Sequence, residues 1–195
     1  MPTNRLGIFL YPGDYRFDRK SARLRTLLGS CVAIALWHPR LRIGGMCHFL
    51  LPGRVRTSSM PLDGNYADEA LSLLVEQMAA AGTFPREYEA RLYGGGNMFP
   101  EMDGCDKNSI GYKNAEAAKQ LVNNYEIRIK AESLGGNGRR MVDFDVARGT
   151  VTVQHNRLSS EPAQCRRCGN RALCHGGVSR SDAVGRGSSI SFVGD

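Results

Sequence analysis

Two short apolar segments in the first third of the chain constrain its fold most strongly. They cover residues 32–37 and 44–51, and each is shorter than a typical helix. Turn residues bound them, since a Gly-Ser step precedes the first segment and Pro52-Gly53 follows the second. Short apolar runs closed in this way are typical of buried strands. We therefore expect a core built on a sheet that contains both segments.

The sequence up to residue 154 alternates between helical and strand-like patterns. Apolar residues recur at helical spacing over residues 70–79, and a second helix is predicted over residues 114–124. Alternating apolar and polar residues predict a strand over 127–132, and residues 141–153 have the pattern of a β-hairpin. Strands outnumber helices in this pattern. We predict a mixed α/β fold in which helices pack on a largely antiparallel sheet core.

Composition divides the chain near residue 155. The 195 residues suffice for one domain of ordinary size and a tail. From His155 onward Ser, Arg and Gly dominate, large apolar residues become rare, and no periodicity persists. We predict one domain over residues 1–154 and a flexible, basic, cysteine-containing extension over residues 155–195.

The charge is unevenly distributed along the chain. The formal net charge is +7, and residues 1–56 carry 10 basic and 2 acidic side chains. Such a segment suits nucleic acid or an acidic protein partner, but no nucleic-acid-binding motif accompanies it, so we expect no nucleic-acid partner. No apolar run approaches the roughly 20 residues of a membrane span, and the N-terminus lacks the pattern of a secretory signal. We expect a cytoplasmic protein that does not insert into membranes.

The two apolar segments place a cysteine and a histidine where they can meet. A hairpin closed by the four-residue loop 38–41 pairs Trp37 with Arg42, and the same register pairs Cys31 with His48. Directly opposed residues share a face, with Cβ atoms roughly 4.5–5.5 Å apart, whereas a one-residue slip separates them. A protonated histidine at that distance lowers the pKa of a thiol, as a nucleophilic cysteine requires. The spacing equally fits a small buried cysteine beside a core histidine.

Several motifs follow one another in order along residues 8–154. They are Tyr11-Pro12-Gly13-Asp14-Tyr15, Thr26-Leu27-Leu28-Gly29-Ser30-Cys31-Val32-Ala33, Gly44-Gly45-Met46-Cys47-His48-Phe49-Leu50-Leu51-Pro52, Tyr66 with Asp68-Glu69-Ala70-Leu71, Gly94-Gly95-Gly96-Asn97-Met98-Phe99, Ile110-Gly111-Tyr112-Lys113-Asn114 and Ala131-Glu132-Ser133-Leu134-Gly135-Gly136-Asn137-Gly138-Arg139. Together they closely resemble the chemoreceptor glutamine deamidases, the CheD family. The resemblance implies a CheD-like layered fold for most of the chain.

The resemblance also implies an activity. It points to a protein-glutamine glutaminase, a hydrolase that converts glutamine side chains of methyl-accepting chemotaxis receptors to glutamate and releases ammonia through a thioester. It assigns the nucleophile to Cys31, the base to His48 and the orienting residue to Thr26, and it implies no cofactor. Each tetrahedral intermediate needs N–H donors for its oxyanion. The backbone at Ser30 and Cys31 is a candidate source of them, because Gly29 permits a sharp turn there.

A non-catalytic adaptor is the alternative function. Such a protein would keep the fold in order to bind chemoreceptors or a CheC-type phosphatase, the partner that the resemblance implies. An adaptor needs neither a nucleophile nor a base. The presence of both Cys31 and His48 therefore favours the enzyme.

The extension contains a group of residues with the chemistry of metal ligands. Cys165 and Cys168 form half of a structural zinc set, and Cys174 and His175 are adjacent to each other without the usual spacer. The simpler interpretation is a basic tail with free thiols. We predict no metal centre, and these four residues are the candidate ligands should zinc bind.

Overall fold

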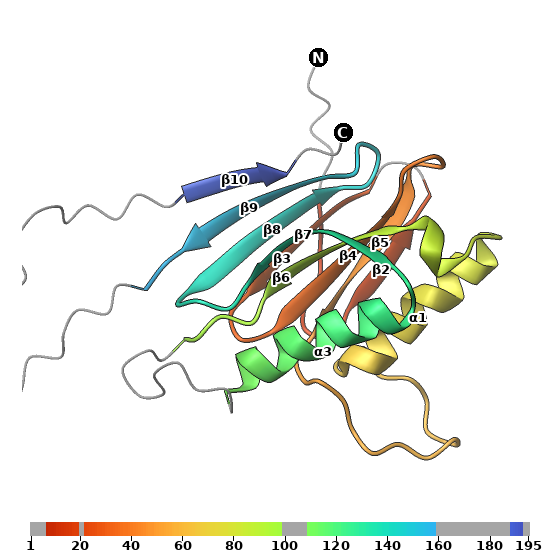
Figure 1. The fold of residues 1–195 in the computed structure, drawn as a ribbon, viewed down its shortest axis with the longest axis horizontal. Helices are drawn as coiled ribbons and strands as arrows, with labels where there is room; N and C mark the ends of the chain where they lie inside the picture. The colour runs from red at the N-terminus through yellow and green to blue at the C-terminus, as the bar shows by residue number, and fades with distance from the viewer. Residues whose placement is uncertain (1–6, 20–21, 99–108, 159–187, 193–195) are drawn as a thin grey trace, which may run out of the picture.

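The computed structural model describes residues 7–19, 22–98, 109–158 and 188–192, which form two five-stranded sheets and two α-helices (Figure 1). The first sheet has the order β1 (Ile8–Phe9), β3 (Arg23–Leu28), β8 (Arg139–Asp145), β9 (Thr150–Asn156) and β10 (Ser188–Phe192). The second has the order β2 (Tyr15–Asp18), β5 (Ile43–Phe49), β4 (Val32–His38), β6 (Glu89–Gly94) and β7 (Arg128–Leu134). The helices are α1 (Ala67–Ala80) and α3 (Ile110–Asn124), and a 3-10 turn, η1 (Pro85–Glu87), precedes β6.

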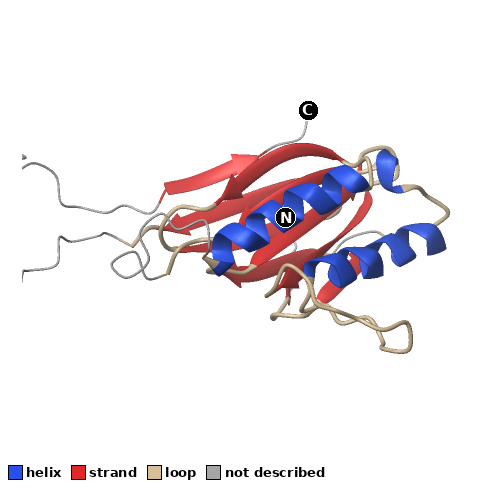
Figure 2. Cartoon of the chain, turned by 60° about the horizontal axis from the view of Figure 1, so that its bottom comes forward, coloured by secondary structure: helices blue, strands red, loops and turns tan. Residues whose placement is uncertain are grey.

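The two sheets and the helices form three layers. Both helices lie on the same side of the strands, over the second sheet (Figure 2). An outer core, between the helices and the second sheet, contains buried residues such as Val32, Ile34, Cys47, Phe49, Leu71, Leu74, Ala118 and Val122. An inner core, between the two sheets, contains Leu10, Leu24, Leu28, Ala33, Ala35, Met46, Val142, Phe144 and Val151. The second sheet is thus covered on both faces.

This architecture confirms the predicted mixed α/β fold with a largely antiparallel sheet core. Among the described strand pairs, only β1 with β3 and β6 with β7 are parallel. The two apolar segments of the sequence form β4 and β5, which are neighbours at the centre of the second sheet. Every residue of β5 is buried, as expected of a strand covered on both faces.

The helix boundaries follow local capping signals. Helix α1 ends before Gly82, whose φ of 73° is left-handed and suits glycine. Helix α3 starts at Ile110, four residues before the predicted start. Its first turn is capped by Ser109, whose side-chain oxygen accepts a hydrogen bond from the Tyr112 N–H at 3.3 Å.

The register of the β4–β5 hairpin differs from the predicted one. Strand β4 pairs with β5 so that Ala33 lies opposite His48 and His38 lies opposite Ile43. The prediction that Cys31 lies directly opposite His48 is therefore wrong by two residues. The turn consists of residues 39–42 and is closed by the Arg42 N–H, which donates to the His38 carbonyl at 2.9 Å. Arg42 adopts a φ of 52°, which lies in the left-handed region that arginine seldom occupies.

The described part of the extension continues the first sheet. His155 and Asn156 belong to β9 and pair with β8, so the predicted domain boundary at residue 155 falls inside a strand. Residues 188–192 form β10, which pairs antiparallel with β9. The sheet extends beyond the predicted boundary because backbone groups pair there. The composition of the tail does not predict this pairing. The candidate zinc ligands Cys165, Cys168, Cys174 and His175 lie outside the described residues.

Candidate active site

Cys31 and His48 both face the space between the two sheets. Side chains alternate between the faces of a strand, and the neighbours Val32, Cys47 and Phe49 all belong to the outer core. Cys31 is half-buried and packs against the inner core. His48 lies on the same face of β5 and is 2% exposed. The two-residue shift in register thus keeps the two side chains on one face.

The pairing also fixes how far apart they lie. His48 is directly opposite Ala33, and Cys31 is two residues before Ala33 on the same face. Residues in this diagonal relationship are roughly 7–8 Å apart at Cα and somewhat closer at Cβ. A side chain as long as histidine can span that separation.

Thr26 contributes from the first sheet. It lies on β3 between Leu24 and Leu28, two members of the inner core, and it is fully buried. Its hydroxyl Oγ1 is 2.8 Å from His48 Nδ1 and 2.8 Å from the Leu10 carbonyl oxygen. The sequence-predicted residues Thr26 and His48 are therefore in direct contact across the two sheets.

These contacts determine which nitrogen of His48 carries its proton. The Leu10 carbonyl can only accept, so the Thr26 hydroxyl donates to it and accepts from His48 Nδ1–H. The neutral imidazole then has its lone pair on Nε2. This atom is buried and has no hydrogen-bond partner among the described residues. His48 thus presents a free basic nitrogen on the face it shares with Cys31.

Burial makes the neutral forms of both groups more stable. It raises the pKa of the Cys31 thiol above its usual 9.0 and lowers the pKa of His48 below 6.5. The Leu10 carbonyl and the charge of Asp14 oppose the shift at His48 without reversing it. Burial therefore opposes the thiolate and the imidazolium, and a lowered thiol pKa stays a prediction. Both shifts favour a thiol beside a neutral imidazole.

The loop before β4 is held through its carbonyl groups. The Gly29 carbonyl accepts from the Gly96 N–H at 2.7 Å, and the Cys31 carbonyl accepts from the Gly95 N–H at 2.8 Å. Asn114 donates to the Ser30 carbonyl at 3.0 Å. No carbonyl of a described residue accepts from the amide N–H of Ser30 or Cys31. Neither amide is therefore committed to a carbonyl among the described residues, and their role as oxyanion donors stays a prediction.

The backbone of His48 is held by the turn before β2. The Gly13 N–H donates to the His48 carbonyl at 2.8 Å, and the His48 N–H donates to the Asp14 carbonyl at 3.0 Å. Gly64 packs directly on this turn, because a Cβ at that position would lie 2.0 Å from the Gly13 carbonyl oxygen. The turn is thus braced by the segment that joins β5 to α1.

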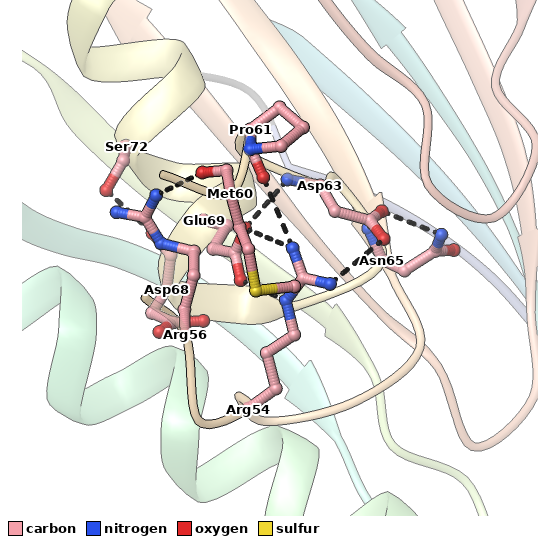
Figure 3. A network of polar contacts seen from close by, with 9 residues as sticks. All are labelled: Arg54, Arg56, Met60, Pro61, Asp63, Asn65, Asp68, Glu69 and Ser72. Atoms are coloured by element: carbon pink, nitrogen blue, oxygen red, sulfur yellow. Dashed lines mark hydrogen bonds and ion pairs between the residues drawn. The ribbon is translucent and has the colours of Figure 1, made fainter. Parts of the chain in front are cut away.

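A polar network anchors that joining segment to α1 (Figure 3). Arg54 donates to both carboxylate oxygens of Glu69, at 2.7 and 3.1 Å, and to the Pro61 carbonyl at 3.2 Å. The Asp63 N–H donates to Glu69 at 2.8 Å. Glu69 is 3% exposed and its pKa is lowered, first by the hydrogen bond from Arg54. One buried carboxylate therefore organises the segment beside the His48 turn.

Sequence reasoning did not identify Asn114 as part of the site. The residue is fully buried in the first turn of α3, and its side chain reaches the loop that carries Ser30. The only sequence signal is its position at the end of the motif that covers residues 110–114. Within the described residues, no three metal-ligating side chains come together, and neither α-helix there combines the length and apolarity needed to cross a bilayer.

The fold and site define a class of protein in which a cysteine and a threonine-bound histidine face the space between two sheets. Residues 50–155 match the family described as CheD chemotactic sensory transduction. The chain is 45% identical over 160 residues to a probable chemoreceptor glutamine deamidase CheD of Pseudomonas savastanoi pv. phaseolicola, covering 82% of this chain and 90% of that protein. The chain belongs to the CheD family.

Further relatives agree with this membership. A protein named probable chemoreceptor glutamine deamidase CheD 3, from Dechloromonas aromatica, is 45% identical and covers 77% of this chain and 88% of its own length. A relative from Desulforamulus reducens, named probable chemoreceptor glutamine deamidase CheD, is 35% identical over 72% of this chain and 86% of that protein. The matches thus span most of the described fold.

Proposed function

We propose that this protein is a cytoplasmic chemoreceptor glutamine deamidase. It hydrolyses the side-chain amide of glutamine residues in methyl-accepting chemotaxis receptors, yielding glutamate and ammonia, with Cys31 as the nucleophile. The names of the relatives support the reaction. The contact between Thr26 Oγ1 and His48 Nδ1 at 2.8 Å carries the mechanism, because it leaves His48 Nε2 as a free base on the face shared with Cys31.

The reaction begins with proton transfer from the Cys31 thiol to His48 Nε2. The thiolate attacks the carboxamide carbon of the glutamine side chain, forming a C–S bond and a tetrahedral oxyanion. Protonated His48 then donates its proton to the nitrogen, the C–N bond breaks, and ammonia leaves. Water, deprotonated by His48, attacks the resulting thioester, which releases glutamate and restores the thiol. His48 thus carries the thiol proton to the departing ammonia, and then carries a proton from water to the Cys31 thiolate as the C–S bond breaks.

The oxyanion of both tetrahedral intermediates is held by the amide N–H groups of Ser30 and Cys31. Losing one such donor typically costs about 2.7–4 kcal/mol of transition-state stabilisation. The glycine at position 29 lets the chain turn sharply before these amides. The thiol and the oxyanion donors therefore come from the same short loop.

Mass spectrometry of a receptor cytoplasmic fragment tests this function. Each deamidated glutamine gains about 1 Da, because an amide nitrogen is exchanged for oxygen by hydrolysis. We expect the gain with the wild type and with Cys47→Ala, whose thiol faces the outer core, and none with Cys31→Ala. An unchanged mass with folded wild type and a cognate receptor would instead favour the alternative, a non-catalytic adaptor that binds receptors or a CheC-type phosphatase.

A further inference from the structure

The side chain of Asn114 connects the two strands that carry the proposed nucleophile and base. Its Nδ2 donates to the Ser30 carbonyl at 3.0 Å and to the Leu50 carbonyl at 2.7 Å. Ser30 is the residue before Cys31, and Leu50 lies two residues after His48. Both N–H bonds of the amide are thereby used. One side chain from α3 thus sets the spacing between the ends of the two strands.

The bond to Ser30 fixes the orientation of a peptide group. The described peptide bonds are trans, so the C=O of Ser30 and the N–H of Cys31 point in opposite directions. Because Asn114 holds the carbonyl, the Cys31 N–H points away from α3. Free rotation of this peptide would turn the carbonyl, instead of the N–H, toward an oxyanion.

The first turn of α3 is seated tightly against the loop that it contacts. A Cβ at Gly95 would lie 2.7 Å from the Gly111 carbonyl oxygen, so the helix backbone packs directly on the glycine-rich segment that follows β6. The Oδ1 atom of Asn114 is buried and has no hydrogen-bond partner among the described residues. Leaving a buried acceptor unpaired typically costs about 1–3 kcal/mol. A residue that served packing alone would avoid this cost.

We propose that Asn114 is a positioning residue for the oxyanion, which holds the Ser30–Cys31 peptide with the Cys31 N–H directed at the reacting carbonyl. This role rests on the proposed function. It predicts that Asn114 matters for the tetrahedral intermediates and not for the reactivity of the thiol. Substitution should therefore separate deamidation from simple alkylation of Cys31, because alkylation by iodoacetamide forms no oxyanion.

The test compares Asn114→Asp, which keeps the shape and loses the donors, with Asn114→Leu, which keeps the volume without a charge. Asn123→Asp, on the exposed face of the same helix, is the matched control. We expect kcat for a receptor fragment to fall about 10- to 100-fold, part of the loss seen when an oxyanion donor is deleted. We expect KM and the rate of Cys31 alkylation to change less than about twofold.

Each outcome is decisive. The role is overturned if both variants keep wild-type kcat, or if kcat and the alkylation rate fall together, since Asn114 would then act through the thiol or the fold. Circular dichroism at the assay temperature identifies an unfolded variant, and the other substitution then decides. Deamidation by Cys31→Ala would overturn the assignment of the nucleophile, and no deamidation by the folded wild type would overturn the proposed function. Both results differ from those that overturn the role of Asn114.

A separate cavity of about 450 Å³ lies beside the turn between β7 and β8. Arg140, His155 and Arg157 line it, and none of the described acidic side chains does. Arg140 is 3% exposed. Its Nε donates to Ser133 Oγ at 3.0 Å, and its Nη2 donates to the Gly135 carbonyl. Its Nη1 has no hydrogen-bond partner among the described residues. No described carboxylate forms an ion pair with Arg140 or Arg157. Buried cations are normally paired.

From this uncompensated charge we infer that the cavity is a binding site for a carboxylate. An acidic side chain of the receptor or a free small carboxylate would supply it, and two measurements distinguish these sources. In the first, which rests on the proposed function, Arg157→Gln and Arg140→Gln raise KM for the receptor fragment at unchanged kcat. Arg139→Gln, an exposed neighbour outside the cavity with the same loss of charge, is the control.

In the second measurement, sodium acetate raises the unfolding temperature of the wild type relative to sodium chloride at equal ionic strength, and does not raise that of Arg157→Gln. A change in KM alone identifies the receptor as the source, and a shift with acetate identifies a free carboxylate. The site is overturned if neither quantity depends on the two cavity arginines, or if Arg139→Gln changes KM equally.

Discussion

Thr26 Oγ1 and His48 Nδ1 lie 2.8 Å apart across the space between the two sheets. The Leu10 carbonyl, 2.8 Å from the same hydroxyl, directs the Thr26 proton away from the imidazole. This contact fixes both the rotation of the ring and the nitrogen that carries its proton. The second sheet thus supplies the thiol and the imidazole, and the first sheet determines how the imidazole is oriented.

Thr26→Val tests this relationship because valine keeps the shape of threonine and removes the hydroxyl. His48 Nδ1–H then loses its acceptor at 2.8 Å and keeps only the Leu10 carbonyl at 3.5 Å. The tautomer with its lone pair on Nε2 and the orientation of the ring are therefore less strongly favoured. We expect kcat to fall about 10- to 100-fold, as general-base contributions allow, and Thr26→Ser to retain most activity. Thr152→Val, on half-buried β9, is the control. Wild-type kcat in Thr26→Val would contradict an orienting role.

The pKa directions predict how the reactivity of Cys31 depends on pH. Burial raises the pKa of the thiol above 9.0 and lowers that of His48 below 6.5. A stable thiolate–imidazolium pair would require the opposite shifts. We expect alkylation of Cys31 by iodoacetamide to increase steadily above neutral pH. The contrary result is a high alkylation rate that stays constant below pH 6.5 in the wild type and is lost in His48→Ala. It would show that the Cys31 thiolate and the His48 imidazolium form an ion pair in the free protein.

Deamidation should have a different pH dependence from alkylation. The reaction needs His48 neutral to accept the thiol proton, and the fraction of neutral His48 rises as pH increases through its lowered pKa. We expect kcat/KM for a receptor fragment to fall on the acid side with a midpoint below pH 6.5. The pH–rate profile of the wild type measures this midpoint, and a midpoint above 6.5 would contradict the burial of the imidazole.

The sequence predicted the common face of Cys31 and His48 but not their register. Side chains alternate between the two faces of a strand, so a shift in pairing by an even number of residues keeps two side chains on the same face. Register depends on the turn, which comprises residues 39–42 instead of 38–41. Arg42 takes its left-handed position (φ 52°), which no glycine or asparagine marks in the sequence. The observed register differs from the predicted one by two residues, and Cys31 and His48 therefore still lie on the same face.

Contacts between residues far apart in the sequence could not be predicted from local patterns. Asn114 reaches carbonyls 84 and 64 residues away, and its own neighbourhood is typical of an ordinary amphipathic helix. Strand β10 pairs with β9 although its surroundings have the composition of a flexible tail. In both cases the tertiary arrangement, not local propensity, determines the partner.

The Arg54–Glu69 pair should contribute to stability in a pH-dependent way. The pKa of Glu69 is lowered below 4.5, so the folded state favours its ionised form. The stabilisation is present above pH 4.5 and is lost as pH falls through the folded-state pKa. We expect the unfolding temperature of Glu69→Gln to be lower than wild type at pH 7 and the difference to shrink in acid. Glu76→Gln, exposed on the same helix, should show no such convergence.

Gly149, in the turn between β8 and β9, should be difficult to replace because it packs on a side chain of the second sheet. Its φ is 67°, and a Cβ there would lie 2.3 Å from Trp37 Cδ2, whose ring is held by a hydrogen bond from Nε1 to the Val146 carbonyl at 2.9 Å. Gly82 is a matched control, because its φ of 73° imposes similar strain but nothing lies within 4 Å of its Cβ position. Left-handed strain costs about 1–2 kcal/mol at either site.

The clash with Trp37 therefore makes Gly149→Ala the more destabilising of the two. Overpacking of a fixed side chain typically adds about 1–3 kcal/mol, so the difference between Gly149→Ala and Gly82→Ala should be of that order. Urea unfolding of both variants measures it. Equal losses of stability would mean that the Trp37 ring moves aside freely and that the contact between β4 and the β8–β9 turn does not hold the two sheets together.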